Sequence, residues 1–207
     1  MAHPLDCGRA GAVHRSLGRT AADLGQDGPA WRRLFAAPVA AFERLRHEIL
    51  GPVIHLPRHP VDLARFGLPS LLPATALARF FSTEAGRALI AGAAAHSFSP
   101  LSQPLSAAVG VALIVSGHSG GWPVARGGSR SVSDALASVI RAEGGTIETG
   151  RRVESLDELP AADAVVLDLA PAGVLEIAGD RLPERVRRAY RRYRYGPGSV
   201  KVDLAVE

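Results

Sequence analysis

The chain has 207 residues, of which 47% are apolar and 21% are charged, and its formal net charge is +4. This composition is typical of a globular protein and excludes a chain that is disordered throughout. The modest positive charge permits anionic ligands but does not require nucleic acid. Because Cys7 is the only cysteine, an internal disulfide and a cysteine metal cluster are excluded, and a reducing, cytoplasmic location is expected.

The first part of the chain predicts helices. A short helical piece at residues 20–24 is followed, over residues 30–50, by apolar residues that recur every three or four positions, as on one face of an amphipathic helix. Asp27 stands where it would cap this helix. Pro38 lies inside the pattern and is expected to kink or split the helix, because proline lacks the N–H that a helix needs.

Further helices are expected along the next part of the chain. Prolines punctuate residues 57–73, which predicts a short helix and turns. Ser82 precedes a helical pattern over residues 83–95 and is expected to cap it. Residues 105–116 are almost entirely apolar, which predicts a buried helix. The unbroken apolar run within it is far shorter than the roughly 20 residues that a membrane span needs, so no transmembrane segment is expected.

The remaining residues predict a mixture of helices and strands. Ser131 and Asp134 have the spacing of a capping box, at the start of a helix that Gly144 is expected to end. Two helices follow later in the chain, over residues 171–178 and 183–193. Apolar patterns of the kind found in strands occupy residues 146–149, 152–156, 164–169 and 200–206.

These patterns predict an α/β or α+β fold in three segments. Residues 14–120 form a helical domain, residues 121–175 mix helix and strand, and residues 176–207 return to helix and strand. The last predicted strand reaches the end of the chain with no partner hairpin after it. An open strand edge is a liability for a protein, so we expect the chain to be cut from something longer.

The most informative turn contains Gly127 and Gly128. Glycine lets a backbone approach a ligand closely, and the N–H groups that open the following helix can face an anion or a polar ring edge. A simple tight turn into a helix is the competing interpretation. No lysine followed by serine or threonine completes a phosphate-binding loop. We find no catalytic dyad, and the histidines do not have metal-binding spacing.

An arginine-rich run occupies residues 181–195, with seven arginines and three tyrosines. Phosphate contacts and tyrosine stacking would allow such a run to bind nucleic acid. An apolar stripe at helical spacing within the run favours instead a solvated helix face. We therefore expect no nucleic-acid partner, and binding through this run stays a weaker alternative.

Four segments resemble phytoene-desaturase-like, flavin-dependent oxidoreductases, which belong to the flavin amine oxidase superfamily. Residues 2–50 resemble the early substrate-domain helices of this family less sharply. Together these segments are more specific than a single short motif. The four segments are residues 93–110 (AAAHSFSPLSQPLSAAVG), 117–136 (GHSGGWPVARGGSRSVSDAL), 144–171 (GGTIETGRRVESLDELPAADAVVLDLAP) and 178–205 (AGDRLPERVRRAYRRYRYGPGSVKVDLA).

The resemblance implies a partial FAD/NAD(P)-binding fold with FAD as cofactor. In such enzymes the turn at Gly127 and Gly128 leads from the substrate domain back into the flavin domain. The backbone of the residue matching Val153, with Arg152 beside it, contacts the flavin adenine. The aromatic–proline pair Trp122-Pro123 would lie at the boundary between substrate and flavin. The family's N-terminal βαβ unit, with its glycine loop for the pyrophosphate, and its C-terminal part have no counterpart in the sequence.

The resemblance therefore implies an internal fragment of an enzyme that transfers a hydride from a C–H or C–N bond of a small apolar substrate to FAD. We expect the chain alone neither to hold FAD tightly nor to turn over. The main alternative is a non-catalytic remnant or interaction module that associates through exposed apolar surface and open strand edges.

Overall fold

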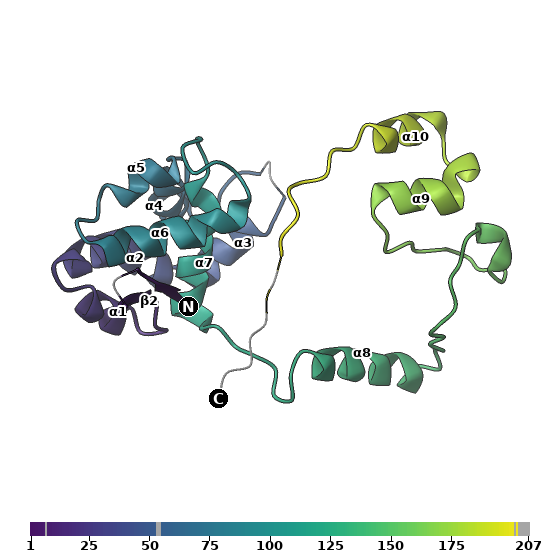
Figure 1. Cartoon of the computed structure of the whole chain (residues 1–207), viewed down its shortest axis with the longest axis horizontal. Helices are drawn as coiled ribbons and strands as arrows, with labels where there is room; N and C mark the ends of the chain where they lie inside the picture. The colour runs from purple at the N-terminus through teal and green to yellow at the C-terminus, as the bar shows by residue number, and fades with distance from the viewer. Residues whose placement is uncertain (7, 53–54, 201, 203–207) are drawn as a thin grey trace. The chain divides into compact units, whose positions relative to one another are not determined.

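The computed structural model describes residues 1–6, 8–52, 55–200 and 202. The chain divides into two compact units, unit 1 (Met1–Val124) and unit 2 (Ala125–Glu207), which are described separately below (Figure 1). Among the described residues the protein is mostly helical, with one small antiparallel sheet. This agrees with the α+β class that the sequence predicts, at the level of helix and strand content.

Unit 1 begins with a hairpin that the sequence did not predict. Strand β1 (Ala2–Pro4) pairs with strand β2 (Ala10–Ala12) in antiparallel register, with His3 opposite Gly11. Each strand has only three residues, too few for an alternating pattern to be visible in the sequence. The hairpin packs against helix α6 (Glu84–Ala94), which supplies the apolar contact that so short a sheet needs.

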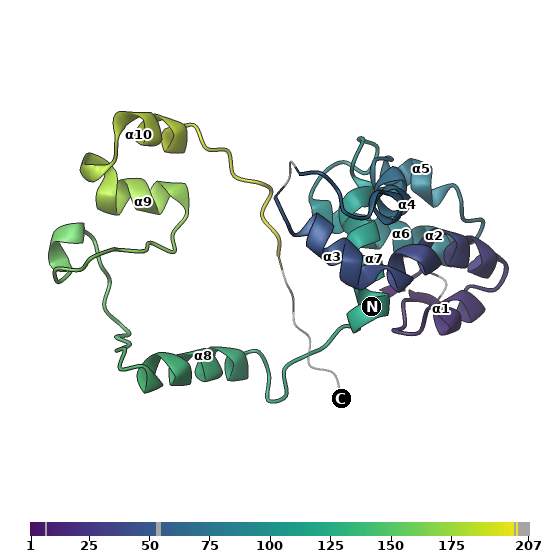
Figure 2. The same cartoon turned by 180° about the vertical axis from the view of Figure 1, so that it is seen from behind.

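The helices of unit 1 pack around α7, which contacts α2, α3, α4, α5 and α6. Figures 1 and 2 show α7 between the other helices from both sides. Nearly all of the buried apolar side chains of the described residues belong to this unit. Besides α6, its helices are α1 (Leu17–Asp23), α2 (Gly28–Ala40), α3 (Phe42–Ile49), α4 (Pro60–Ser70), α5 (Ala74–Ala78) and α7 (Ala107–Gly120).

The long amphipathic pattern over residues 30–50 forms two helices. Helix α2 contains Pro38 and ends at Ala40, and α3 begins at Phe42. The expected split of the helix is thus confirmed, and it falls at Ala41, three residues after Pro38. The physical reason is that proline has no N–H to donate to a helical hydrogen bond and that its ring crowds the preceding turn.

The expected cap on this pattern was wrong. Asp27 makes no side-chain hydrogen bond to α2. Its carboxylate instead accepts hydrogen bonds from Ser82 and Thr83, at the start of α6. The cap of α6 is Thr83, whose hydroxyl accepts a hydrogen bond from the N–H of Gly86, rather than the expected Ser82. The carboxylate offers two acceptor oxygens to donors that a local pattern cannot reveal.

The apolar segment 105–116 is a buried helix, as predicted: α7 buries Val111, Ile114 and Val115. Helices α6 and α7 approach closely at Gly110, where a β-carbon would lie 2.8 Å from the backbone nitrogen of Ala94. Glycine is therefore the residue that allows this helix crossing. Within the described parts of the chain, no helix is both long enough and apolar enough to cross a bilayer.

Unit 2 contains three helices among its described residues, α8 (Arg130–Ala142), α9 (Pro171–Ala178) and α10 (Glu184–Arg191). Helices α9 and α10 pack against each other. Ala178 is the one apolar side chain that is buried in the described part of this unit. Unit 2 therefore has almost no core of its own.

The strands predicted in unit 2 do not form. Residues 146–149, 152–156 and 164–169 belong to no sheet, and Val166 is 91% exposed rather than buried on both faces. A strand is stable only when a neighbour pairs its backbone, and none of the described residues does so here. Most of the predicted strand over residues 200–206 lies outside the described residues, and the two that are described, Val200 and Val202, are in no strand.

The predicted capping box at the start of α8 was also wrong. The Ser131 hydroxyl donates to the carbonyl of Gly128, and Asp134 forms an ion pair with Arg130. A capping box does occur further along, where Ser155 and Glu158 close a short helical turn on each other. The three-residue spacing of Ser131 and Asp134 does not by itself produce a capping box, because a serine hydroxyl can instead donate a hydrogen bond to a carbonyl of the preceding turn.

Candidate functional site

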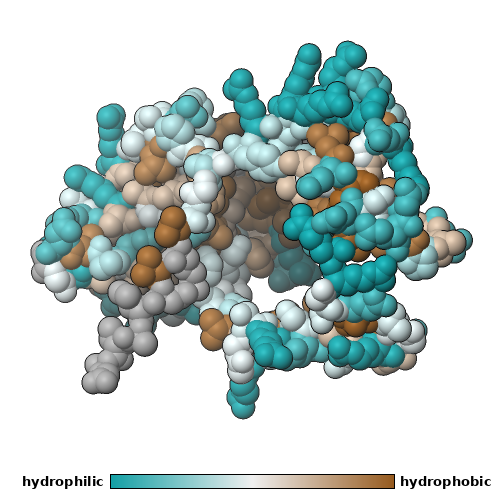
Figure 3. Space-filling view, turned by 45° about the vertical axis from the view of Figure 1, so that its right-hand side comes forward, coloured by the Kyte–Doolittle hydropathy of each residue, from teal (hydrophilic) through white to brown (hydrophobic). Residues whose placement is uncertain are grey.

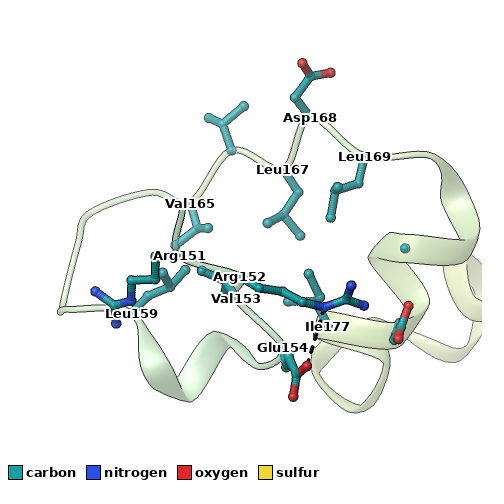
Figure 4. Close-up of a pocket in the computed structure, with 13 residues that line it drawn as sticks. Arg151, Arg152, Val153, Glu154, Leu159, Val165, Leu167, Asp168, Leu169 and Ile177 are labelled. Carbon is teal, nitrogen blue, oxygen red and sulfur yellow. Dashed lines mark ion pairs between the residues drawn. The ribbon is translucent and has the colours of Figure 1, made fainter. Parts of the chain in front are cut away.

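A pocket of about 590 Å³ lies in unit 2. Two extended segments, 151–154 and 165–169, form its walls together with α9 (Figure 4). Figure 4 shows Leu167 and Leu169 directed toward the pocket and Asp168 directed away from it. The 164–169 segment thus alternates as an extended chain does, although it joins no sheet.

The turn that follows Val153 is held by the side chain of Glu158. One oxygen of Glu158 accepts hydrogen bonds from the N–H groups of Glu154 and Ser155, at 3.2 and 3.0 Å. The guanidinium of Arg151 donates to the Glu158 carbonyl at 3.0 Å. These contacts position the residues on both sides of Val153.

The charged groups at the pocket are largely paired and exposed. Arg152 forms an ion pair with Glu154, with 3.4 Å between Nε and Oε1, which Figure 4 marks with a dashed line. Arg151 pairs with Glu148 at 3.2 Å. Exposed pairs of this kind contribute little to stability, so Arg152 can exchange its partner for a bound anion at small cost.

The backbone of Val153 is unpaired. Its N–H and C=O form no hydrogen bond within the part of the chain that the structure describes. Around it lie the apolar side chains of Leu159, Val165 and Ile177. A flat ring with polar edges fits such a place, since its faces meet apolar side chains and its edge meets a free backbone N–H or C=O.

Of the site residues that the sequence predicts, the structure brings only Arg152 and Val153 together at this pocket. Gly127 and Gly128 lie in the turn before α8 and do not line it. Both have positive φ, +84° and +86°, so this turn needs glycine for its backbone conformation alone. Beyond Gly128 the chain enters α8 with no side-chain cap.

Trp122 and Pro123 lie at the end of unit 1. The indole of Trp122 covers Gly117 of α7, where a β-carbon would collide with it. The indole is partly exposed. Trp122 therefore packs on the last turns of α7, and this contact explains its position within unit 1 without any ligand.

A second pocket, of about 460 Å³ and in unit 1, surrounds a carboxylate that the sequence analysis did not single out. The side chain of Glu48 is only 3% exposed. It accepts a hydrogen bond from His55 Nε2 at 2.6 Å and from the N–H groups of Arg58 and His59. A polar residue on the apolar side of a helical pattern was the signal that could have revealed it.

The charges of this second pocket complement each other. The hydrogen bond to Glu48 raises the pKa of His55, and the same bond lowers the pKa of Glu48. His55 Nδ1 faces the carbonyl of Pro52 at 2.7 Å. Both ring nitrogens thus meet acceptors, which is the arrangement of a protonated imidazolium. The pair fastens a loop to α3, and no three ligand side chains gather as at a metal site in the described residues.

Comparison of the chain with protein-family models, with curated proteins and with solved structures finds no significant match.

Proposed function

We propose that the chain is part of a flavin-dependent oxidoreductase of the phytoene-desaturase-like kind and that the pocket beside Val153 receives the adenine end of FAD. The observation that carries this proposal is the unpaired backbone of Val153 at the wall of an apolar pocket. The residues that the family resemblance assigns to adenine, Val153 and Arg152, both line that pocket. FAD would supply the hydride acceptor, and this chain would orient its adenine end.

The residues present fit the adenine but not the whole dinucleotide. Apolar side chains make up much of the walls, and the backbone edge of Val153 forms no hydrogen bond to the described residues, as a purine requires. No G-x-G-x-x-G turn occurs in the sequence to receive the pyrophosphate. The phosphate groups carry the charge that a helix N-terminus and backbone amides would otherwise bind. We therefore expect weak binding of FAD and no turnover by the chain alone.

Calorimetry with ADP, which carries adenine without flavin, tests the proposal. Saturable binding to the full chain is expected in the range of about 0.1–1 mM. Val153→Pro removes the backbone N–H and is expected to weaken binding about tenfold, because a buried polar edge would lose its partner. Val153→Ala keeps the N–H and is expected to change affinity less than threefold, because the adenine edge is proposed to meet the backbone of Val153 rather than its side chain.

Equal affinities of the proline and alanine variants would place adenine elsewhere. Absence of saturable ADP binding up to 10 mM would overturn the proposal as a whole.

A second candidate function is association, and α8 favours it. Its apolar residues Val132, Leu136, Val139 and Ile140 share one face of the helix, and none of them is buried. Leu136 is 63% exposed. An exposed apolar stripe on a unit with almost no core is typical of a surface that a partner covers.

Light scattering after size exclusion, at protein concentrations from 1 to 100 µM, tests this association. The wild-type chain is expected to shift from monomer to dimer or larger species as concentration rises. Leu136→Glu is expected to remain monomeric, because a charge at the centre of the stripe opposes burial. The matched control Ser138→Glu adds the same charge on the opposite face of α8, where the side chain is exposed. A wild-type monomer throughout the range would contradict this candidate.

A further inference from the structure

Helix α10 separates apolar and basic side chains onto two faces. Leu182, Val186 and Tyr190 are partly buried at helical spacing, and α10 packs against α9. This part of the expectation from the sequence, an apolar stripe under a solvated face, agrees with the structure. Figure 3 shows hydrophilic surface gathered over the upper part of unit 2, where α10 lies.

The basic face is not neutralised by the acids beside it. Glu184 and Asp180 are both engaged by Arg187, at 2.6 and 3.6 Å. Arg185, Arg188 and Arg192 are exposed, and within the described residues they form no ion pair. These three guanidinium groups lie at positions i, i+3 and i+7 and line a shallow hollow of about 380 Å³.

Two exposed aromatic rings follow this face in the chain. Tyr193 and Tyr195 are each more than half exposed, and their rings meet edge to face with centroids 5.1 Å apart. The hydroxyl of Tyr195 accepts a hydrogen bond from the N–H of Ala172 at the start of α9. The residues after α10 are thereby tied back to α9, and Tyr193, which directly follows Arg192 in the chain, packs its ring on the ring of Tyr195.

We propose that this face, Arg185, Arg188 and Arg192 together with Tyr193, binds single-stranded nucleic acid. Guanidinium groups match phosphate oxygens bidentately, and an exposed ring offers a base a stacking surface. An acidic membrane fits less well, because an interfacial helix inserts its apolar face and α10 has turned that face onto α9. The proposal is independent of flavin binding.

Fluorescence anisotropy of the full chain with a labelled 20-residue oligo(dT) tests it across 50–200 mM NaCl. Three phosphate contacts on a single strand predict a slope of log K against log salt of about −2, which is about a 20-fold loss of affinity over this range. The triple variant Arg185→Gln, Arg188→Gln, Arg192→Gln is expected to bind at least about tenfold more weakly at 50 mM, with a slope near zero. Tyr193→Leu is expected to weaken binding about fivefold or more with the slope unchanged.

The matched control removes three exposed arginines from unit 1: Arg33→Gln, Arg65→Gln, Arg79→Gln. It has the same net charge as the α10 variant and is expected to retain wild-type affinity within twofold. Glutamine and arginine have similar helix propensities, and circular dichroism checks that both variants keep their helices. Equal losses in the two triple variants would show attraction by net charge and overturn the proposal. Binding to vesicles with 30% phosphatidylserine but not to the oligonucleotide would also overturn it.

Discussion

Replacing Asp27 with alanine is expected to lower the free energy of unfolding of unit 1 by about 3 kcal/mol. The carboxylate is 3% exposed and accepts four hydrogen bonds. Ser82 donates its N–H and hydroxyl to Oδ1 at 2.8 and 2.7 Å, and Thr83 donates the same groups to Oδ2 at 2.8 and 2.5 Å. Alanine would leave two backbone N–H groups without partners. Urea unfolding followed by circular dichroism measures the loss.

Matched substitutions separate charge from shape at this position. Asp27→Asn is expected to cost nearly as much as alanine, because its amide nitrogen would face donors. Asp23→Ala, which removes one half-exposed contact to His14, is expected to cost less than about 1 kcal/mol. Equal stability of the Asp27 and Asp23 variants would contradict the role assigned to Asp27.

The same carboxylate makes unit 1 sensitive to acid. Burial raises its pKa, but the hydrogen bonds from Thr83 and Ser82 outweigh this and lower it from 3.8 to about 2. The stabilisation by Asp27 is fully present above pH 4 and is lost as the pH falls toward 2. Between these values the Asp27 carboxylate takes up a proton in the unfolded chain but not yet in the folded one, which favours unfolding. The difference between the ordinary pKa of 3.8 and the folded-state pKa of about 2 corresponds to about 2 kcal/mol in the free energy of unfolding. Asp27→Asn is expected to lack this part of the acid sensitivity.

The second large effect is expected at Trp31, where alanine should cost about 4 kcal/mol. The indole is fully buried and contacts the rings of Phe35 and Phe81, with centroids 4.5 and 5.8 Å away. Its N–H donates to His118 Nε2 at 3.0 Å. The variant would leave both a large cavity and an unpartnered buried nitrogen. Urea unfolding followed by circular dichroism avoids relying on the fluorescence of the removed ring.

The hydrogen bond at Trp31 also specifies the tautomer of His118. The Nδ1 of His118 faces the carbonyl of Arg15 at 3.3 Å, so Nδ1 carries the proton and donates, and Nε2 accepts the hydrogen bond from the Trp31 indole. Burial lowers the pKa of His118. Trp31→Phe, which keeps a ring but not the donor, is expected to cost about 2 kcal/mol. Trp122→Phe, at a partly exposed ring, is the control and should cost under about 1 kcal/mol. A Trp31→Ala variant as stable as this control would contradict the prediction.

Local patterns were sufficient for most helices of unit 1. The apolar spacing over residues 30–50 and the run over 105–116 correspond to α2, α3 and α7, and the split follows Pro38. Helical periodicity depends on neighbours within four residues, so it is visible in the sequence. The role of Asp27 was not visible, since its partners lie 55 and 56 residues away. The partners of the buried Glu48 carboxylate lie in the loop after α3, 7 to 11 residues further along, and its position on the apolar side of the helical pattern was the one local signal.

The pocket of unit 2 was only partly predictable. The resemblance pointed to Arg152 and Val153, and both line the pocket. The predicted strands around them are extended but unpaired, because pairing depends on a neighbouring chain segment rather than on the pattern of one segment. The same limit applies to α10, because the order of residues does not show that Arg187 engages both nearby acids, which leaves Arg185, Arg188 and Arg192 without an ion pair among the described residues.

The sequence by itself determined where helices form, which helix is buried, and which stretch is rich in arginine, because each follows from the order of apolar, polar and charged residues along a few turns. Only the tertiary structure decided that Asp27 holds the start of α6, that Val153 faces a pocket with a free backbone, and that one face of α10 keeps its charge. Hydrogen bonds and ion pairs between distant residues depend on how the elements pack, and packing is not a property of any single segment.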